Sequence, residues 1–137
     1  SWLFWCFRTT ELATMNDEKA ILGVIKEFLA AGDVQDTVRL AETLDPTFRI
    51  AINQFMGEPG VNIIDRASYL QLVGAKKLGG DPRTSKTINV EIVGNVAFVR
   101  AKVKNSQLQF DTLYVLAKDV DNRWWLVSET PYVTPIG

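Results

Sequence analysis

The chain contains no histidine among its 137 residues. This absence excludes Ser-His-Asp and Cys-His nucleophilic catalysis, histidine-based proton transfer, and the usual zinc and non-haem iron ligand sets. Any chemistry therefore depends on Asp, Glu, Tyr, Lys, Arg or Ser side chains. The single cysteine, Cys6, cannot form an internal disulfide, so no feature requires an oxidising compartment and we expect a cytoplasmic location.

Clusters of one charge sign are also missing. The 15 Lys and Arg residues nearly balance the 16 Asp and Glu residues, and no block of like charge stands out. Because binding to a phosphate backbone needs clustered Lys and Arg, we expect no nucleic-acid partner. Neither a glycine-rich phosphate loop nor a cluster of metal-ligating residues is present, so we expect no cofactor and no metal.

Long hydrophobic runs are absent as well. The aromatic run from Trp2 to Phe7 is too short to span a bilayer and lacks the flanking features of a complete secretory signal, so we expect no membrane partner. We interpret residues 1–15 as an N-terminal arm, either a tag remnant or an extension before a natural start at Met15. Because exposed aromatic runs become ordered by burial, we expect this arm to pack on its own domain or on a partner. Residues 16–137 are expected to form one domain.

Helical periodicity is strongest from Asn16 to Ala31, with Asn16 or Thr14 as the expected N-cap. The apolar residues on one face of this helix are Ile21, Val24, Ile25, Phe28 and Leu29. A shorter helix is expected from about Asp33 to Leu44, before the Asp-Pro pair. The alternation of Phe48 to Asn53 predicts a strand, and Asp65 is expected to cap a third helix that ends near Val73.

The segment from Thr84 to Tyr132 predicts four consecutive antiparallel strands. Their expected bounds are Lys86–Val93, Val96–Lys104, Leu108–Lys118 and Arg123–Thr130. Gly94-Asn95 is typical of a two-residue hairpin turn, and Pro131 is expected to end the last strand because it lacks a backbone donor. The third of these strands is apolar on both faces, so we expect both of its faces to be covered.

Five segments, in this order, carry a resemblance to a known family: AILGVIKEFLAAGD, FRIAINQFMG, DRASYLQLV, VEIVGNVAFVRAKV and FDTLYVLAKDVDNRWWLVSET. From residue 16 to residue 132 the chain resembles the NTF2-like superfamily, also called SnoaL-like, and most of all the branch described as lumazine-binding. The resemblance implies an α+β fold, a cone-shaped α+β barrel in which a curved mixed or antiparallel sheet wraps around three N-terminal helices. It also implies a pocket at the open end of the cone and a homodimer formed through the outer face of the sheet.

Asp111 is the first candidate for catalysis. It lies between Phe110 and Leu113, in an apolar setting of the kind that makes a carboxylate a stronger base, and it matches the acidic position in the family's Phe-Asp strand. Tyr69 is the candidate hydrogen-bond donor to a carbonyl or enolate. The alternative for Asp111 is an ion pair with Arg100 or Lys102 on the outer face of the sheet. Strand alternation leaves both sides open, because either face can be the inner one.

The candidate ligand-binding residues are Phe28, Asn53, Phe55, Met56, Tyr69, Tyr114 and Trp124. For Phe28 and Trp124 plain core packing is the alternative, and for Tyr114 a buried ring with its hydroxyl bonded to water or backbone. In the family's steroid-isomerase branch, the proton-abstracting carboxylate lies near the end of the first strand, just before a glycine. Here that stretch reads Asn53-Gln54-Phe55-Met56-Gly57 and has no acid, which argues against that activity.

Three functions are compatible with these observations. The first is a largely apolar pocket that binds a small apolar molecule without catalysis. The second is an isomerase, cyclase or hydrolase that uses Asp111 as general base and Tyr69 as donor. The third is an association module whose cone is filled by side chains and whose purpose is dimerisation.

Overall fold

The structure is a computed structural model and describes the backbone of residues 2–136 and the side chains of residues 12–136. In chain order its elements are α1 (Trp2–Asp33), α2 (Thr37–Ala41), β1 (Leu44–Asn53), the short 3₁₀ helix η1 (Phe55–Gly57), β2 (Val61–Asp65), α3 (Arg66–Gly74), β3 (Thr84–Val93), β4 (Val96–Lys104), β5 (Leu108–Lys118) and β6 (Trp124–Pro135).

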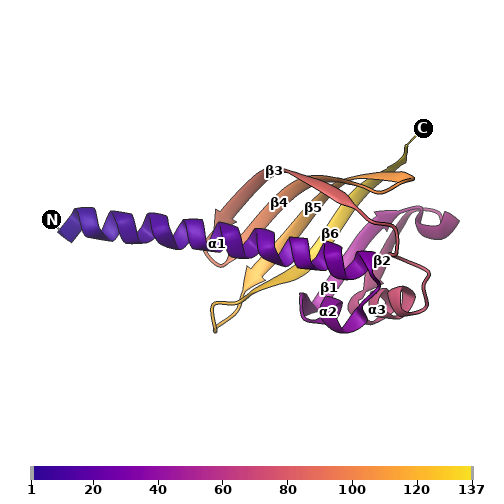
Figure 1. Cartoon of the computed structure of the whole chain (residues 1–137), viewed down its shortest axis with the longest axis horizontal. Coiled ribbons are helices and arrows are strands. Elements are labelled where there is room, and N and C mark those ends of the chain that lie inside the picture. The colour runs from indigo at the N-terminus through magenta and orange to yellow at the C-terminus, as the bar shows by residue number, and fades with distance from the viewer. Residues whose placement is uncertain (1, 137) are drawn as a thin grey trace.

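Within these residues, six strands form one sheet in the order β2-β1-β6-β5-β4-β3. β1 and β6 run parallel, and the other neighbouring strands are antiparallel. The sheet curves without closing, α1 crosses one of its faces, and α2 and α3 lie at one end (Figure 1). This architecture confirms the predicted α+β cone, in which a mixed sheet wraps around the helices.

The core lies between α1 and the central strands. The buried inward residues of β4 and β5 are Ala97, Val99, Ala101, Val103, Thr112, Tyr114 and Leu116. The buried apolar residues of α1 are Ile21, Ile25, Phe28, Ala31 and Leu29. These positions repeat with a period of two in the strands and at helical spacing in α1, as expected for faces that meet in a core.

Helix α1 is longer than expected, because it begins at Trp2 rather than near Asn16. No glycine or proline precedes Gly23, so nothing in that stretch interrupts helical hydrogen bonding. The ribbon of the first half of α1 extends past the sheet (Figure 1). None of the described helices is long and apolar enough to cross a bilayer. The expected packing of the aromatic arm concerns side chains outside the described ones and stays a prediction.

Two elements between α1 and α3 differ from expectation. α2 is only Thr37–Ala41 and is capped by Asp36, whose carboxylate accepts a hydrogen bond from the backbone N–H of Arg39. β2, Val61–Asp65, was not expected, since its residues do not alternate between apolar and polar. β2 forms because it pairs with β1 at the edge of the sheet, and its local sequence does not predict this pairing. The predicted cap of α3 is confirmed, because the Asp65 side chain accepts from the backbone N–H of Ser68.

The four-stranded meander is confirmed, with a two-residue turn at Gly94-Asn95 between β3 and β4. The expected end of β6 at Pro131 is wrong, because β6 continues to Pro135 and Pro131 pairs with Thr112 of β5. β1 pairs with β6 only as far as Glu129. Beyond that residue β6 has a partner on one side alone, and a proline is tolerated where a strand has a free edge.

Candidate functional site

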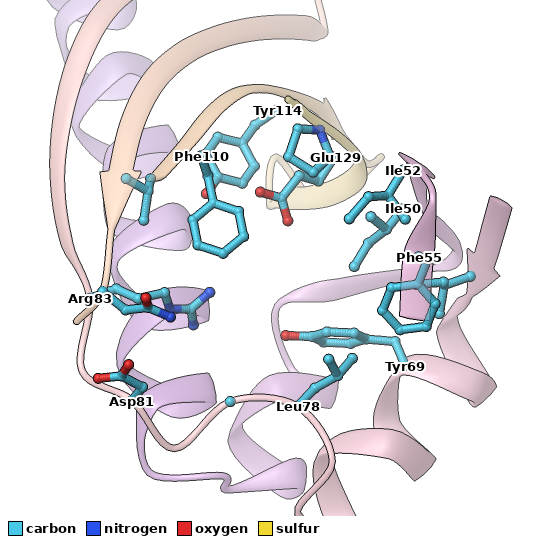
Figure 2. A pocket seen from close by; sticks show the side chains of 15 residues that line it. Ile50, Ile52, Phe55, Tyr69, Leu78, Asp81, Arg83, Phe110, Tyr114 and Glu129 are labelled. Atoms are coloured by element: carbon cyan, nitrogen blue, oxygen red, sulfur yellow. The ribbon is translucent and has the colours of Figure 1, made fainter. Parts of the chain in front are cut away.

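A cavity of about 140 Å³ lies between the inner face of the sheet, α3 and the loop that precedes β3. Its apolar side chains are Ile50, Ile52, Phe55, Ile64, Leu78, Val103, Phe110 and Pro131, and its polar ones are Tyr69, Asp81, Arg83, Asn105, Tyr114 and Glu129. Figure 2 shows Arg83, Tyr69 and Glu129 pointing from three sides toward the same open space. The cavity therefore combines apolar walls with a small polar centre.

Glu129 of β6 supplies the buried carboxylate of this centre. Only 8% of the residue is exposed, and its Oε2 accepts a 2.9 Å hydrogen bond from the Thr112 hydroxyl. Burial raises the pKa of Glu129, and this effect outweighs the Thr112 hydrogen bond and the positive charge of Arg83, which lower it. Glu129 thus keeps its proton at a higher pH than an exposed glutamate does.

Arg83 supplies the positive charge and is held against the end of α1. Its Nε donates to Asp33 Oδ1 at 2.7 Å, and its backbone N–H donates to Asp33 Oδ2 at 3.0 Å. Its Nη2 donates to the backbone carbonyl of Leu29 at 3.0 Å. Both side chains of the ion pair are largely shielded from solvent, so the guanidinium is fixed in place before any ligand arrives.

Two tyrosine hydroxyls complete the polar centre. The ring of Tyr69 packs against Phe28 and Phe48, which fixes its hydroxyl toward the cavity (Figure 2). Burial raises the pKa values of Tyr69 and Tyr114, so both remain protonated donors at neutral pH. The Tyr114 hydroxyl is buried beside Glu129, and a hydrogen bond between the two groups is among the causes that lower the pKa of the Glu129 carboxyl and raise the pKa of the Tyr114 hydroxyl.

Gly32, near the end of α1, leaves room for this arrangement. A Cβ atom at Gly32 would lie 2.5 Å from Nη2 of Arg83 and 3.7 Å from the Tyr69 hydroxyl. Any side chain at this position would therefore displace the guanidinium from its hydrogen bonds.

Three of the residues predicted from sequence line the cavity: Phe55, Tyr69 and Tyr114. Asp111 does not, and its proposed role as the base of this pocket needs correction. It lies on the opposite face of β5 from Tyr114 and forms an ion pair with Arg100, with 3.2 Å between Asp111 Oδ2 and Arg100 Nη2. The alternative of an outer-face ion pair is the one that the structure contains.

The other predicted ligand-binding residues lie elsewhere. Phe28 is buried behind Tyr69 and does not line the cavity. Trp124 is buried at the far end of the sheet, where its indole N–H donates to Asp17 of α1 at 3.0 Å. Asn53 is the last residue of β1 and Met56 lies in η1; both are exposed, Met56 to 64%, and neither lines the cavity.

Glu129 was missed because of an irregularity in β6. The pairing jumps from Val115–Ser128 to Leu116–Leu126, so Val127 is an extra residue in a β-bulge. Simple alternation from Trp124 and Leu126 would place Ser128 inward, whereas the bulge turns Glu129 inward. Glu129 stands between Ser128 and Thr130, so its local sequence gives no signal of burial.

Arg83 was missed for a different reason. Its partner Asp33 is 50 residues away in the chain, and the loop around Arg83 carries no pattern of its own.

Among the described residues, no group of three His, Cys, Asp or Glu side chains is placed to hold a metal ion.

Comparison with known proteins identifies the fold through solved structures. No family model matches the chain, and neither does any curated protein. An NTF2-like protein of unknown function from Shewanella baltica is 17% identical, with a TM-score of 0.75 over 89% of this chain and 97% of that one. A second one, from Silicibacter pomeroyi, is 13% identical, with a TM-score of 0.76 over 88% and 98%.

A ketosteroid isomerase-like protein from Erwinia carotovora atroseptica is 15% identical, with a TM-score of 0.64 over 87% of this chain and 95% of that one. Identities this low show a shared fold alone. The closeness to the lumazine-binding branch stays a prediction.

Proposed function

We propose that this chain, whose NTF2-like fold is confirmed by its solved neighbours, binds a small organic molecule in the cavity between sheet and helices. The observation that carries the proposal is the convergence of hydrogen-bond donors from Arg83 and Tyr69 on a cavity with mostly apolar walls. Ligand sites are usually built in this way, from apolar walls with a few polar groups that fix orientation.

The layout of the cavity indicates the kind of ligand. Ile50, Ile52 and Phe55 lie on the side away from Arg83 (Figure 2), where an apolar body would be buried. Arg83 and Tyr69 offer donors, so the head group of the ligand should carry hydrogen-bond acceptors. The expected ligand is therefore apolar over most of its surface, with one accepting end.

The test is a titration of the labelled protein, followed by NMR, with small apolar carbonyl compounds, carboxylic acids and flavin-like heterocycles. We expect shift changes confined to the residues that line the cavity. Arg83→Lys should weaken binding at least tenfold, because lysine lacks the planar fork of donors. Arg100→Lys makes the same change on the outer face and should bind as the wild type does. Equal binding by the two variants, or no shift changes at the cavity, would contradict the proposal.

A second candidate function is proton transfer, favoured by the raised pKa of the buried Glu129. Glu129 would take a proton from the carbon next to a carbonyl group, and the electron pair of that C–H bond would become part of an enolate. The donors of Arg83 and Tyr69 would stabilise the negative charge on the enolate oxygen. In this mechanism Glu129 takes the role that the sequence suggested for Asp111.

The exchange of α-hydrogens of bound ketones for deuterium from heavy water tests this candidate. Glu129→Gln should slow the exchange by about 10²–10⁴-fold with little effect on binding, since a positioned general base contributes about that much. Asp111→Asn, on the outer face, should exchange at the wild-type rate. An unchanged rate in Glu129→Gln would eliminate Glu129 as the base.

We also propose a homodimer through the outer face of the sheet. Leu113 is 41% exposed on that face, and Val115 and Ala117 of β5 lie beside it, half-buried. A second copy would cover this apolar strip, and symmetric dimers are the commonest soluble assemblies. The dimer is independent of the ligand, because the cavity lies on the opposite face of the sheet.

A further inference from the structure

We infer that the ligand of this cavity is a small monocarboxylate and that its binding is coupled to the uptake of one proton by Glu129. This inference rests on the proposed binding function and adds the chemical class of the head group. It is argued from the unused donors of Arg83, the position of Glu129 and the balance of charge in the cavity.

Arg83 has more donors than the protein uses. A guanidinium carries five N–H groups in a planar fork, and the hydrogen bonds to Asp33 and Leu29 use only Nε and one N–H of Nη2. Nη1 has no acceptor among the described residues, and the guanidinium points into the cavity (Figure 2). A carboxylate fits the open end of this fork, because its two oxygens accept two parallel N–H bonds.

The carboxylate of Glu129 faces the same space, and its Oε2 is already bonded to Thr112. The titratable and charged groups around Glu129 are Tyr114 of β5, Tyr69 of α3, Arg83 and Asp81 of the loop before β3, and Asp33 of α1 behind Arg83. β1 contributes only apolar side chains, Ile50 and Ile52, to the cavity. Arg83 is thus the one cation among the described residues that line this cavity, and Asp33 already pairs with it.

A ligand carboxylate would bring a second negative charge beside Glu129. When two carboxylates share one site, the last to ionise keeps its proton to a much higher pH. Protonated Glu129 becomes a donor, and an O–H group that donates to a carboxylate forms a short, strong hydrogen bond. In that state Arg83, Tyr69 and Glu129 all donate, so the ligand must supply the acceptors, and a carboxylate supplies the most.

Proton uptake makes binding depend on pH. Below the raised pKa of Glu129 the proton is already present, and affinity is constant. Between that pKa and the still higher pKa of Glu129 in the complex, each binding event takes one proton from the buffer, so affinity should fall about tenfold per pH unit. A neutral ligand with the same apolar body has no such dependence.

Calorimetric titration tests the inference with four probes: hexanoate and phenylacetate, and the matched neutral amides hexanamide and phenylacetamide. Titrations run from mildly acidic to mildly alkaline pH, in two buffers that differ in ionisation enthalpy, so that proton uptake is measured directly. We expect the carboxylates to bind more tightly than the amides at acidic pH. We also expect close to one proton taken up per carboxylate at alkaline pH, with dissociation constants that rise about tenfold per pH unit.

Glu129→Gln should bind the carboxylates with an affinity independent of pH and without proton uptake. Glu91→Gln, an equivalent change at an exposed position of β3, should behave as the wild type does. If the amides bind as well as the acids, or if Glu129→Gln keeps the proton uptake, the inference is wrong while the binding function stands. If neither these probes nor the wider set of carbonyl compounds and heterocycles binds, the binding function fails as well.

Discussion

At the residue scale, the side chain with the largest consequences is Glu129, a carboxylate buried in a cavity that also contains an arginine. Its environment disfavours the charged form, so the protein carries a destabilising group at neutral pH. A buried residue whose charged form is disfavoured in this way is typical of ligand-binding and catalytic sites, not of positions that only stabilise the fold. The effect of Glu129 on the free energy of unfolding can be measured without knowing the ligand.

We expect Glu129→Gln to stabilise the protein at neutral pH. The folded-state pKa of Glu129 lies above the ordinary value of 4.5, so the folded protein holds this proton more tightly than the unfolded chain does. The contribution of this proton to the free energy of unfolding is complete below the ordinary pKa. It is lost as pH rises from the ordinary pKa through the folded-state pKa, at about 1.4 kcal/mol per pH unit. Urea unfolding at several pH values should show similar stabilities at acidic pH and a more stable variant at neutral pH. A difference that does not change with pH would contradict this prediction.

Gly32 allows a second prediction at this scale. Gly32→Ala would place a methyl group against Nη2 of Arg83 and should destabilise the protein by about 1–3 kcal/mol, because overpacking forces neighbours to move. It should also weaken ligand binding, since Arg83 is displaced. Gly23→Ala is the control on the same helix, where a Cβ atom meets nothing within 4 Å. That change should stabilise by roughly 0.5–1 kcal/mol, as alanine replaces glycine inside a helix. Similar unfolding midpoints for the two variants would show that Gly32 has no steric role.

At the scale of elements, the contact that orients α1 on the sheet is centred on Asp17. Its carboxylate accepts hydrogen bonds from the Trp124 indole of β6 at 3.0 Å and from Lys118 of β5 at 3.2 Å. Asp17 therefore connects the middle of α1 to the turn between β5 and β6. Arg83 and Asp33 connect the C-terminal end of the same helix to the loop before β3.

Asp17→Ala should destabilise the protein by about 1–2 kcal/mol, because it removes hydrogen bonds to one charged and one neutral donor. The buried indole N–H of Trp124 would lose its acceptor, so tryptophan fluorescence should change as well. Unfolding in urea, followed by fluorescence, measures both effects. Glu18→Ala removes the neighbouring exposed carboxylate and should change stability by less than about 0.5 kcal/mol. If both variants unfold alike, Asp17 does not anchor the helix.

At the scale of the whole molecule, the two faces of the sheet carry different side chains and different contacts. The inner face meets the helices and encloses the cavity, whereas the outer face holds Asp111, Arg100 and an apolar strip around Leu113. A change on the outer face should therefore alter assembly without altering the cavity.

We expect the wild type to sediment as a homodimer and Leu113→Glu to sediment as a monomer. The substitution would bury a carboxylate in the proposed interface twice, once for each copy, and unpaired buried charge is strongly unfavourable. Val120→Glu is the matched control, since Val120 is 97% exposed in the turn between β5 and β6. Sedimentation velocity distinguishes the outcomes. A monomeric wild type, or a Leu113→Glu variant that dimerises as well as Val120→Glu, would rule out this interface.

Several elements could be predicted because their pattern is local. The apolar face of α1, the alternation of β4 and the turn at Gly94-Asn95 follow from the spacing of residues a few positions apart. The order of these elements carried the resemblance to the NTF2-like superfamily, and that resemblance implied the cone. The side that Asp111 occupies was not determined, because β5 is apolar on both faces and alternation identifies two faces without naming the inner one.

Tyr69 and Tyr114 of the polar centre could be predicted from the sequence, whereas its two charged residues could not. An extra residue at Val127 turns Glu129 inward, and this bulge exists through pairing with β5. Arg83 reaches the cavity because Asp33, 50 residues earlier, holds it there. Both effects arise from contacts between segments far apart in the chain, which no local spacing encodes. The spacing of residues along the chain thus predicts helices and strands, and the long-range contacts decide which charges lie between them.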